Sequence, residues 1–121
     1  MKTNNIIFGN NFKHPEILIT EDGHLSISGN SISVRPEDSF VPLIKWITSY
    51  KGTNLSIEIN LNIINCGTVK LLLKAMVAAD ANINIQKRSI IWFFKDEESQ
   101  EIGEMILSNL KNSKLKLYCK N

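Results

Sequence analysis

The chain has 121 residues, of which 43% are hydrophobic and 21% charged, and its formal net charge is +2. This size and balance are typical of one soluble globular domain that can bury its own core. The weak charge argues against nucleic acid as a partner. No segment approaches the roughly 20 apolar residues of a membrane span or the apolar core of about 7–15 residues of a signal peptide. We therefore expect a cytoplasmic protein without direct membrane insertion, in which Cys66 and Cys119 are reduced thiols.

Hydrophobic periodicity predicts a β-hairpin followed by alternating helices and strands. Before the hairpin, residues 1–13 are polar and rich in Asn, and we expect a loosely ordered segment whose apolar run, residues 6–8, docks on the domain. The expected elements are strands over 16–19 and 25–29, a helix from 36 to 51, a strand over 55–63, a helix from Asn65 to about Ala79, a strand over 89–94, a helix from 95 to 110 and a strand over 115–119.

The stretch from Leu55 to Met76 has the clearest pattern. Apolar residues alternate with polar ones from Leu55 to Ile63, which predicts a strand with one buried and one polar face. From Val69 onward the apolar residues recur at spacings of three and four, which predicts an amphipathic helix. Asn65 lies between the two patterns and is a favourable N-cap for this helix.

Other segments are less regular. Residues 80–87 fit either a strand or the end of a helix plus a loop. The run 89–94, SIIWFF, is almost continuously apolar, which is typical of a strand buried on both faces. Ile32 and Val34 are expected to extend the pairing of the hairpin.

The order of the elements predicts a single α/β domain over residues 1–121. Alternating strands and helices imply right-handed crossovers and a largely parallel or mixed sheet covered by helices. The hairpin adds an antiparallel edge to this sheet.

Residues suited to catalysis or metal binding are sparse. His14 and His24 lie near the hairpin and only Cys66 lies at a turn suited to function, so a Cys–His pair lacks an orienting third group. The two cysteines and two histidines form no closely spaced ligand pairs for zinc. There is no glycine-rich nucleotide-binding motif, and we expect neither a cofactor nor a metal.

The turn Asn65-Cys66-Gly67-Thr68 joins the central strand to its helix. A helix N-terminus has unpaired amides and the positive end of the helix dipole, so this turn favours an anion or a phosphoryl group. The alternative is an ordinary capped helix that binds nothing, since capping is the commonest role of Asn at this position.

Several segments resemble, in order and spacing, the SiaC family of bacterial biofilm-regulating phosphoproteins. The hairpin arm G-x-L-x-I-x-G at Gly23–Gly29 and the helix end I-x-W at Ile44–Trp46 are similar to the opening of the family. The segment Asn65–Lys70 is similar to the N-T-S-S-x-K that follows the family's central strand. Residues 91–96, IWFFKD, are similar to its W-x-[YF] strand and acidic helix. The resemblance spans about Lys13 to Tyr118.

The resemblance implies a STAS-like fold, similar to the anti-sigma-factor antagonists, and a non-enzymatic partner-switch protein. Such a protein binds a membrane-associated diguanylate cyclase when unphosphorylated and promotes cyclic-di-GMP synthesis and biofilm formation. A cognate Ser/Thr protein kinase phosphorylates the threonine after the central strand and blocks binding, and a PP2C-type phosphatase reverses this. A phosphate adds about two negative charges at this helix N-terminus, which would repel a partner that fits the neutral surface.

The chain departs from the family pattern at the phosphoacceptor. The family's threonine falls on Cys66 and the following serine on Gly67, and neither accepts phosphate in the usual way. Thr68 matches the family's second serine and is the remaining hydroxyl of the turn, so it is the predicted phosphoacceptor. Two other hypotheses stay open. One is constitutive partner binding, and the other is a redox switch at Cys66, where the helix N-terminus favours the thiolate.

We predict that the partner contacts the turn, Asn65 to Thr68, and the exposed side of the following helix. Lys70 and Lys74 lie four residues apart on one face of that helix and could meet an acidic patch. An anti-sigma-factor antagonist that binds an anti-sigma kinase is the alternative within the binding class. A small thiol enzyme that uses Cys66 is the alternative in another class.

Overall fold

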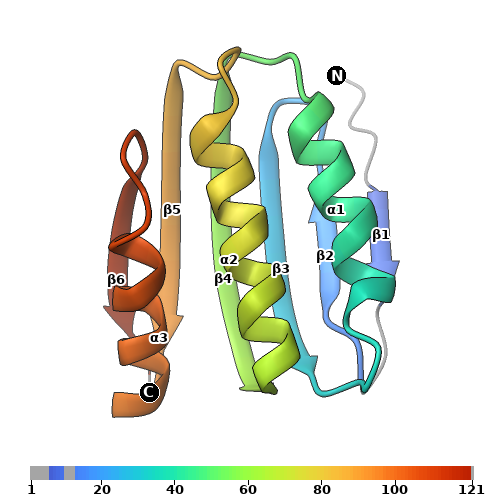
Figure 1. The fold of residues 1–121 in the computed structure, drawn as a ribbon, viewed down its shortest axis with the longest axis vertical. Coiled ribbons are helices and arrows are strands. Elements are labelled where there is room, and N and C mark those ends of the chain that lie inside the picture. Colours follow the sequence, from blue (N-terminus) through green and yellow to red (C-terminus); the bar gives the residue numbers. More distant parts are fainter. Residues whose placement is uncertain (1–5, 10–12, 121) are drawn as a thin grey trace.

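The computed structural model describes residues 6–9 and 13–120. Within these residues, one sheet of six strands packs against three helices (Figure 1). None of the described helices has both the length and the apolar character needed to cross a bilayer. The elements are β1 (Ile6–Gly9), β2 (Glu16–Ile19), β3 (His24–Ser31), α1 (Glu37–Ser49), β4 (Asn54–Ile64), α2 (Cys66–Ala81), β5 (Lys87–Phe94), α3 (Glu97–Leu107) and β6 (Lys114–Cys119).

The strands lie in the sheet in their sequence order. β1, β2 and β3 pair antiparallel, and the pairs from β3 to β6 are parallel. This confirms the predicted α/β class and mixed sheet. Each parallel pair needs a crossover, which α1, α2 and α3 supply. Because the strand order never reverses, crossovers of one hand place these helices on the same face of the sheet (Figure 1).

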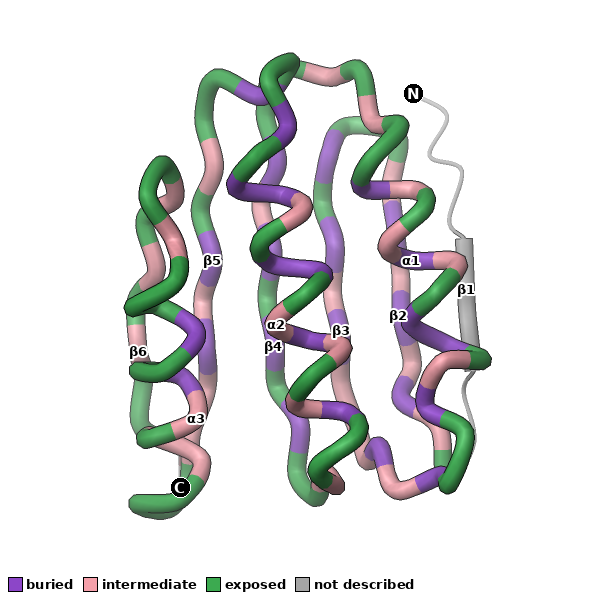
Figure 2. Tube along the Cα trace, viewed as in Figure 1, coloured by how far each residue is buried: buried purple, intermediate pink, exposed green. Residues whose placement is uncertain are grey.

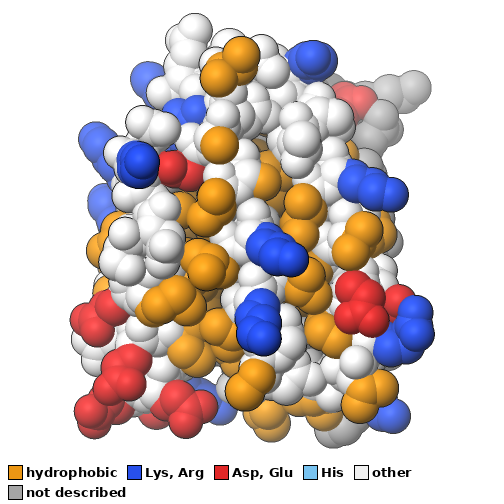
Figure 3. All heavy atoms as spheres, in the orientation of Figure 1, with side chains coloured by type: hydrophobic (Ala, Val, Ile, Leu, Met, Phe, Trp, Pro, Cys, Tyr) orange, Lys and Arg blue, Asp and Glu red, His pale blue; other side chains and the backbone are white. Residues whose placement is uncertain are grey.

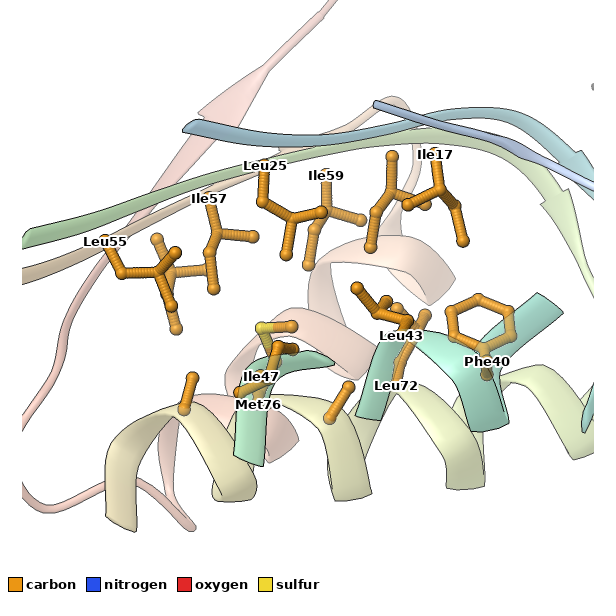
Figure 4. Packing of buried hydrophobic residues seen from close by; sticks show 14 of the residues in the cluster. Ile17, Leu25, Phe40, Leu43, Ile47, Leu55, Ile57, Ile59, Leu72 and Met76 are labelled. Atoms are coloured by element: carbon orange, nitrogen blue, oxygen red, sulfur yellow. The ribbon is translucent and has the colours of Figure 1, made fainter. Parts of the chain in front are cut away.

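The hydrophobic core lies between the helix layer and the sheet. Inward and outward residues alternate along β2 and most of β4, as the period of two predicted, and buried positions recur on the inner side of α1 and α2 (Figure 2). Figure 4 shows the buried side chains of the strands pointing at those of the two helices. The largest fully buried side chains are those of Phe40, Ile17, Ile19, Leu25, Ile27, Leu43, Ile47, Ile57, Ile59, Leu72, Met76 and Ile90.

The prediction that residues 89–94 are buried on both faces is wrong. Ile90 and Trp92 of β5 are buried, but the alternate residue Phe93 is only half-buried. The helices cover one face of the sheet, so the outward side chains of β5 rely on neighbouring strands. Phe93 stacks on Tyr118 of β6 with 6.0 Å between the ring centroids.

The connection between β3 and α1 also differs from the prediction. Ile32 and Val34 do not extend the pairing, since β3 ends at Ser31. A register shift between Gly29 and Ser31 marks the point where the chain starts to leave the sheet. Pro36, the N-cap of α1, lacks the amide that a continuing ladder would need. Residues 32–36 therefore form a loop, and this loop borders the candidate site.

The N-terminal segment contains a strand that was not predicted. Residues 6–9 form β1, which pairs antiparallel with β2 at the edge of the sheet. Residues 1–5 and 10–12 lie outside the described residues, so the expectation of loose order stays a prediction there.

Of the two interpretations of residues 80–87, the helix end plus loop is correct. The Asp80 side chain is buried near the end of α2 and accepts hydrogen bonds from Lys111 N (2.9 Å), Asn112 N (2.8 Å) and Ser113 Oγ (2.8 Å). Burial alone would raise the pKa of Asp80, but these hydrogen bonds outweigh it and hold the pKa below its usual value. The carboxylate thus joins α2 to the turn before β6.

Replacing Asp80 with Asn is expected to lower the free energy of unfolding at neutral pH by about 1–3 kcal/mol, because an ionised acceptor is lost from a buried cluster. The folded-state pKa of Asp80 is depressed, so its stabilisation is complete above the unfolded pKa and is lost as the pH falls through the folded pKa. Urea unfolding of both proteins across acidic and neutral pH measures this. A difference that stays constant down to the most acidic pH would contradict the assignment.

Candidate docking site at the N-terminus of α2

Asn65 shapes the turn between β4 and α2. Its backbone is extended (φ −100°, ψ 172°), and its Oδ1 accepts a hydrogen bond from Thr68 N at 2.9 Å, which confirms the predicted N-cap. Its Nδ2 donates to the carbonyl oxygen of Ser33 at 2.8 Å. Asn65 therefore holds the start of α2 and the loop of residues 32–36 together.

Thr68 points into the protein rather than toward solvent. Its side chain is fully buried, and its Oγ1 lies 2.9 Å from Asn65 Oδ1, 3.1 Å from the carbonyl oxygen of Ser31 and 2.6 Å from Ser31 Oγ. The hydroxyl has one proton to donate to an acceptor, and it can also accept one hydrogen bond from Ser31 Oγ. This cluster joins the first turn of α2 to the end of β3, so the predicted phosphoacceptor is an enclosed group.

Cys66 and Gly67 are the exposed residues of the turn. Cys66 is the first residue of α2 and has a free thiol. A Cβ atom on Gly67 would lie 3.1 Å from Pro36 Cγ, so a side chain there would press on the loop before α1. The resemblance places hydroxyls at three positions of the turn. The two that face solvent, Cys66 and Gly67, have no hydroxyl here, and the third, Thr68, is buried.

Exposed apolar side chains border the turn. Val34 is 94% exposed in the loop that Asn65 and Pro36 hold against α2, and Ile63 is 54% exposed near the end of β4. The two residues flank the turn, with Val34 in the loop that leads to α1 and Ile63 on the side of α3. Neither residue was predicted for the site, because Val34 was assigned to strand pairing and Ile63 to the predicted strand from Leu55 to Ile63. Pro36, two residues later, is the sequence feature that could have identified a loop.

The charged side chains around the turn are unevenly distributed. Lys70 and Lys74 are both exposed on α2, as predicted. Figure 3 shows basic side chains over α2 with hydrophobic side chains on either side, and acidic side chains gathered over the start of α3. Asp96 caps α3 and, together with Ile63, lines a hollow of about 230 Å³ between the end of β4 and the start of α3. The helices α1, α2 and α3 all begin at the end of the sheet where the parallel strands β3, β4 and β5 finish (Figure 1).

His24 lies too far from Cys66 to form a nucleophile pair with it. His24 begins β3, at the opposite end of the parallel strands from the turn, and the eight residues of β3 span about 25 Å. The Nδ1 atom of His14 lies 3.0 Å from Ser39 Oγ in the first turn of α1. Among the described residues, no cluster of three or more His, Cys, Asp or Glu could hold a metal ion.

Replacing Asn65 with Ala is expected to lower the free energy of unfolding by about 1–2 kcal/mol, because the substitution removes the N-cap of α2. The same change also removes the hydrogen bond to Ser33 that holds the neighbouring loop. Chemical unfolding followed by circular dichroism measures the loss. The matched control is Asn54→Ala, at an exposed position at the start of β4. Equal stability of the two variants would show that the cap does not hold the turn.

Comparison with known proteins gives a consistent result. Residues 9–119 match a family described as SiaC family regulatory phosphoprotein. The fold is similar to the crystal structure of apo-SiaC from Pseudomonas aeruginosa, with a TM-score of 0.79 and 16% identity over 95% of this chain and 98% of that one.

A second similar structure is that of the P. aeruginosa diguanylate cyclase SiaD in complex with its activator SiaC, with a TM-score of 0.78 and 16% identity over 95% and 99% of the two chains. A search of curated proteins found no match. The identities are too low to transfer individual residues, but the family match covers most of the sequence. The chain belongs to the SiaC family of regulatory phosphoproteins.

Proposed function

We propose that this protein is a non-enzymatic regulator that binds a diguanylate cyclase and promotes cyclic-di-GMP synthesis. The observation that supports this is the family match over residues 9–119. A SiaC protein of the same fold is the activator in a complex with the cyclase SiaD. The alternative of a thiol enzyme that pairs His24 with Cys66 has no comparable support, since the two residues lie at opposite ends of the parallel strands.

The proposed docking surface consists of the turn, Asn65 to Thr68, with Val34, Ile63, Lys70 and Lys74 around it. Its exposed apolar residues supply area that gains free energy when a partner covers it. The two lysines favour a partner with acidic groups beside an apolar centre, and such charges mainly set specificity and association rate.

The same proposal extends to the cellular location of this protein and to a kinase and a phosphatase as further partners. A cytoplasmic location suits a protein with two exposed free thiols, Cys66 and Cys119. In the family's partner switch, a Ser/Thr protein kinase and a PP2C-type phosphatase would act on a hydroxyl in the turn after β4.

The experiment that tests the function begins with affinity capture of the tagged chain from its own bacterium. We expect a protein with a GGDEF domain to be recovered. Adding the purified chain to that purified cyclase is then expected to raise the rate of cyclic-di-GMP production from GTP, measured by chromatography. Recovery of an anti-sigma kinase instead would favour the antagonist alternative. No change in rate at saturating concentrations of the chain would contradict activation.

A further inference from the structure

The surface of the turn offers no oxygen nucleophile to a kinase. Cys66 and Gly67 are exposed but have no hydroxyl. Phosphoryl transfer requires the acceptor oxygen to lie in line with the γ-phosphoryl group of ATP, inside the active site of the kinase. A side chain must therefore project from the surface to be phosphorylated, and the two residues of this turn that face solvent cannot serve.

The Thr68 hydroxyl faces the wrong way for this reaction. It is fully buried, and polar atoms of Asn65 and Ser31 surround it at 2.6–3.1 Å. A phosphate on Oγ1 would place about two negative charges and three more oxygens in this space. The only donor among these contacts that could face it is Ser31 Oγ, because the Ser31 carbonyl and Asn65 Oδ1 are acceptors. The site is shaped for a neutral hydroxyl.

Other hydroxyls near the turn are enclosed as well. Ser31 is 1%, Ser39 2% and Ser33 7% exposed. The hydroxyl oxygen Oγ of Ser33 accepts a hydrogen bond from Arg35 N, and Oγ of Ser39 lies 3.0 Å from His14 Nδ1. None of these three hydroxyls is exposed, so none of them can serve as the phosphoacceptor in place of Thr68.

Exposing Thr68 would require the first turn of α2 to open. That opening breaks the N-cap made by Asn65 and separates Thr68 from Ser31. It also disturbs Leu72, one helical turn later, which is fully buried in the core. Helix ends that are tied to the core in this way open less readily than frayed ends.

We propose that this protein docks on its partner constitutively, because its α2 turn cannot be phosphorylated while the domain is folded. The inference rests on the proposed function for the identity of the partner. It replaces the family's off state with a permanently unphosphorylated surface, in which the buried Thr68 hydroxyl is a structural link between α2 and β3. Control of the cyclase would then depend on the amount of this protein rather than on its modification.

The test measures phosphate and affinity on the same material. The full-length tagged chain is purified from its own bacterium in exponential and stationary phase, with phosphatase inhibitors present. Trypsin releases residues 52–70 as one peptide, which contains Thr53, Ser56 and Thr68, and mass spectrometry compares it with a synthetic peptide phosphorylated at Thr68. We expect unmodified Thr68 and one affinity for the cyclase in both preparations. Phosphate on Thr68 in either preparation would overturn the proposal.

Two variants separate this inference from the proposed function. Cys66→Asp places a carboxylate on the exposed first residue of α2 and is expected to weaken cyclase binding by about tenfold or more. Ala81→Asp places the same carboxylate on the exposed last residue of α2, outside the docking surface, and is expected to bind as the wild type does. If wild-type protein and Cys66→Asp bind equally, or neither binds, the docking surface or its partner is wrong. If wild-type protein binds and its affinity falls with phosphate on Thr68, only the constitutive mode is wrong.

Discussion

Thr68→Glu is expected to lower the free energy of unfolding by about 3 kcal/mol or more, because it introduces a carboxylate where a neutral hydroxyl is fully buried. The new group must either stay charged beside the carbonyl oxygen of Ser31 or take up a proton at a raised pKa. Both outcomes cost free energy, and the larger side chain also exceeds the space available. Urea unfolding followed by circular dichroism and by tryptophan fluorescence measures the effect.

The matched control is Cys66→Glu, which adds the same carboxylate two residues earlier at an exposed position. It is expected to change stability by less than about 0.5 kcal/mol, and a negative charge near a helix N-terminus is favourable. Thr68→Ser retains the hydroxyl and separates its contribution from that of the methyl group. If Thr68→Glu were as stable as Cys66→Glu, the side chain at position 68 would have to reach solvent, and the argument against phosphorylation of Thr68 would fail.

Val34→Asp is expected to weaken binding of the cyclase by about 1–2 kcal/mol, which corresponds to a factor of about 5 to 30 in Kd. The substitution replaces exposed apolar area beside the turn with a charge that a partner would have to desolvate. Because Val34 is 94% exposed in the free protein, the free energy of unfolding should hardly change. Isothermal titration calorimetry with the purified cyclase measures the affinity.

Ile83→Asp is the matched control for Val34→Asp, since Ile83 is also 94% exposed but follows the C-terminus of α2, at the opposite end of that helix from the turn. The same change at the same exposure should leave the affinity unaltered there. If the two variants weaken binding equally, the partner does not bind preferentially at the end of the domain where α2 begins. A loss with Ile83→Asp alone would move the docking surface to the other end of the helix.

Local patterns predicted most of the elements for clear physical reasons. The alternation from Leu55 to Ile63 requires one covered face, and β4 has one. Asn65 was predicted to cap the helix, and its side chain accepts from Thr68 N as an N-cap does. Such features depend on neighbours in sequence, so they can be read before the chain is folded.

Features that depend on the packing of the whole chain were less predictable. The apolar run 89–94 looked like a strand buried on both faces, but the unreversed strand order places the helices on one face. Val34 looked like part of a strand, but a register shift after Gly29 and the start of α1 at Pro36 leave it in an exposed loop. In both cases the local composition was compatible with more than one environment.

The sequence by itself determined the α/β class, the capped turn after the central strand and the resemblance to the SiaC family, which implies that Cys66 stands at the acceptor position. Only the tertiary structure decided the state of Thr68. Its hydroxyl meets Ser31, which lies 37 residues earlier on a different strand. No periodicity within α2 reports that contact, because it arises when parallel pairing brings the ends of β3 and β4 side by side. The residue that looked like the last available phosphoacceptor is therefore a buried link between two elements.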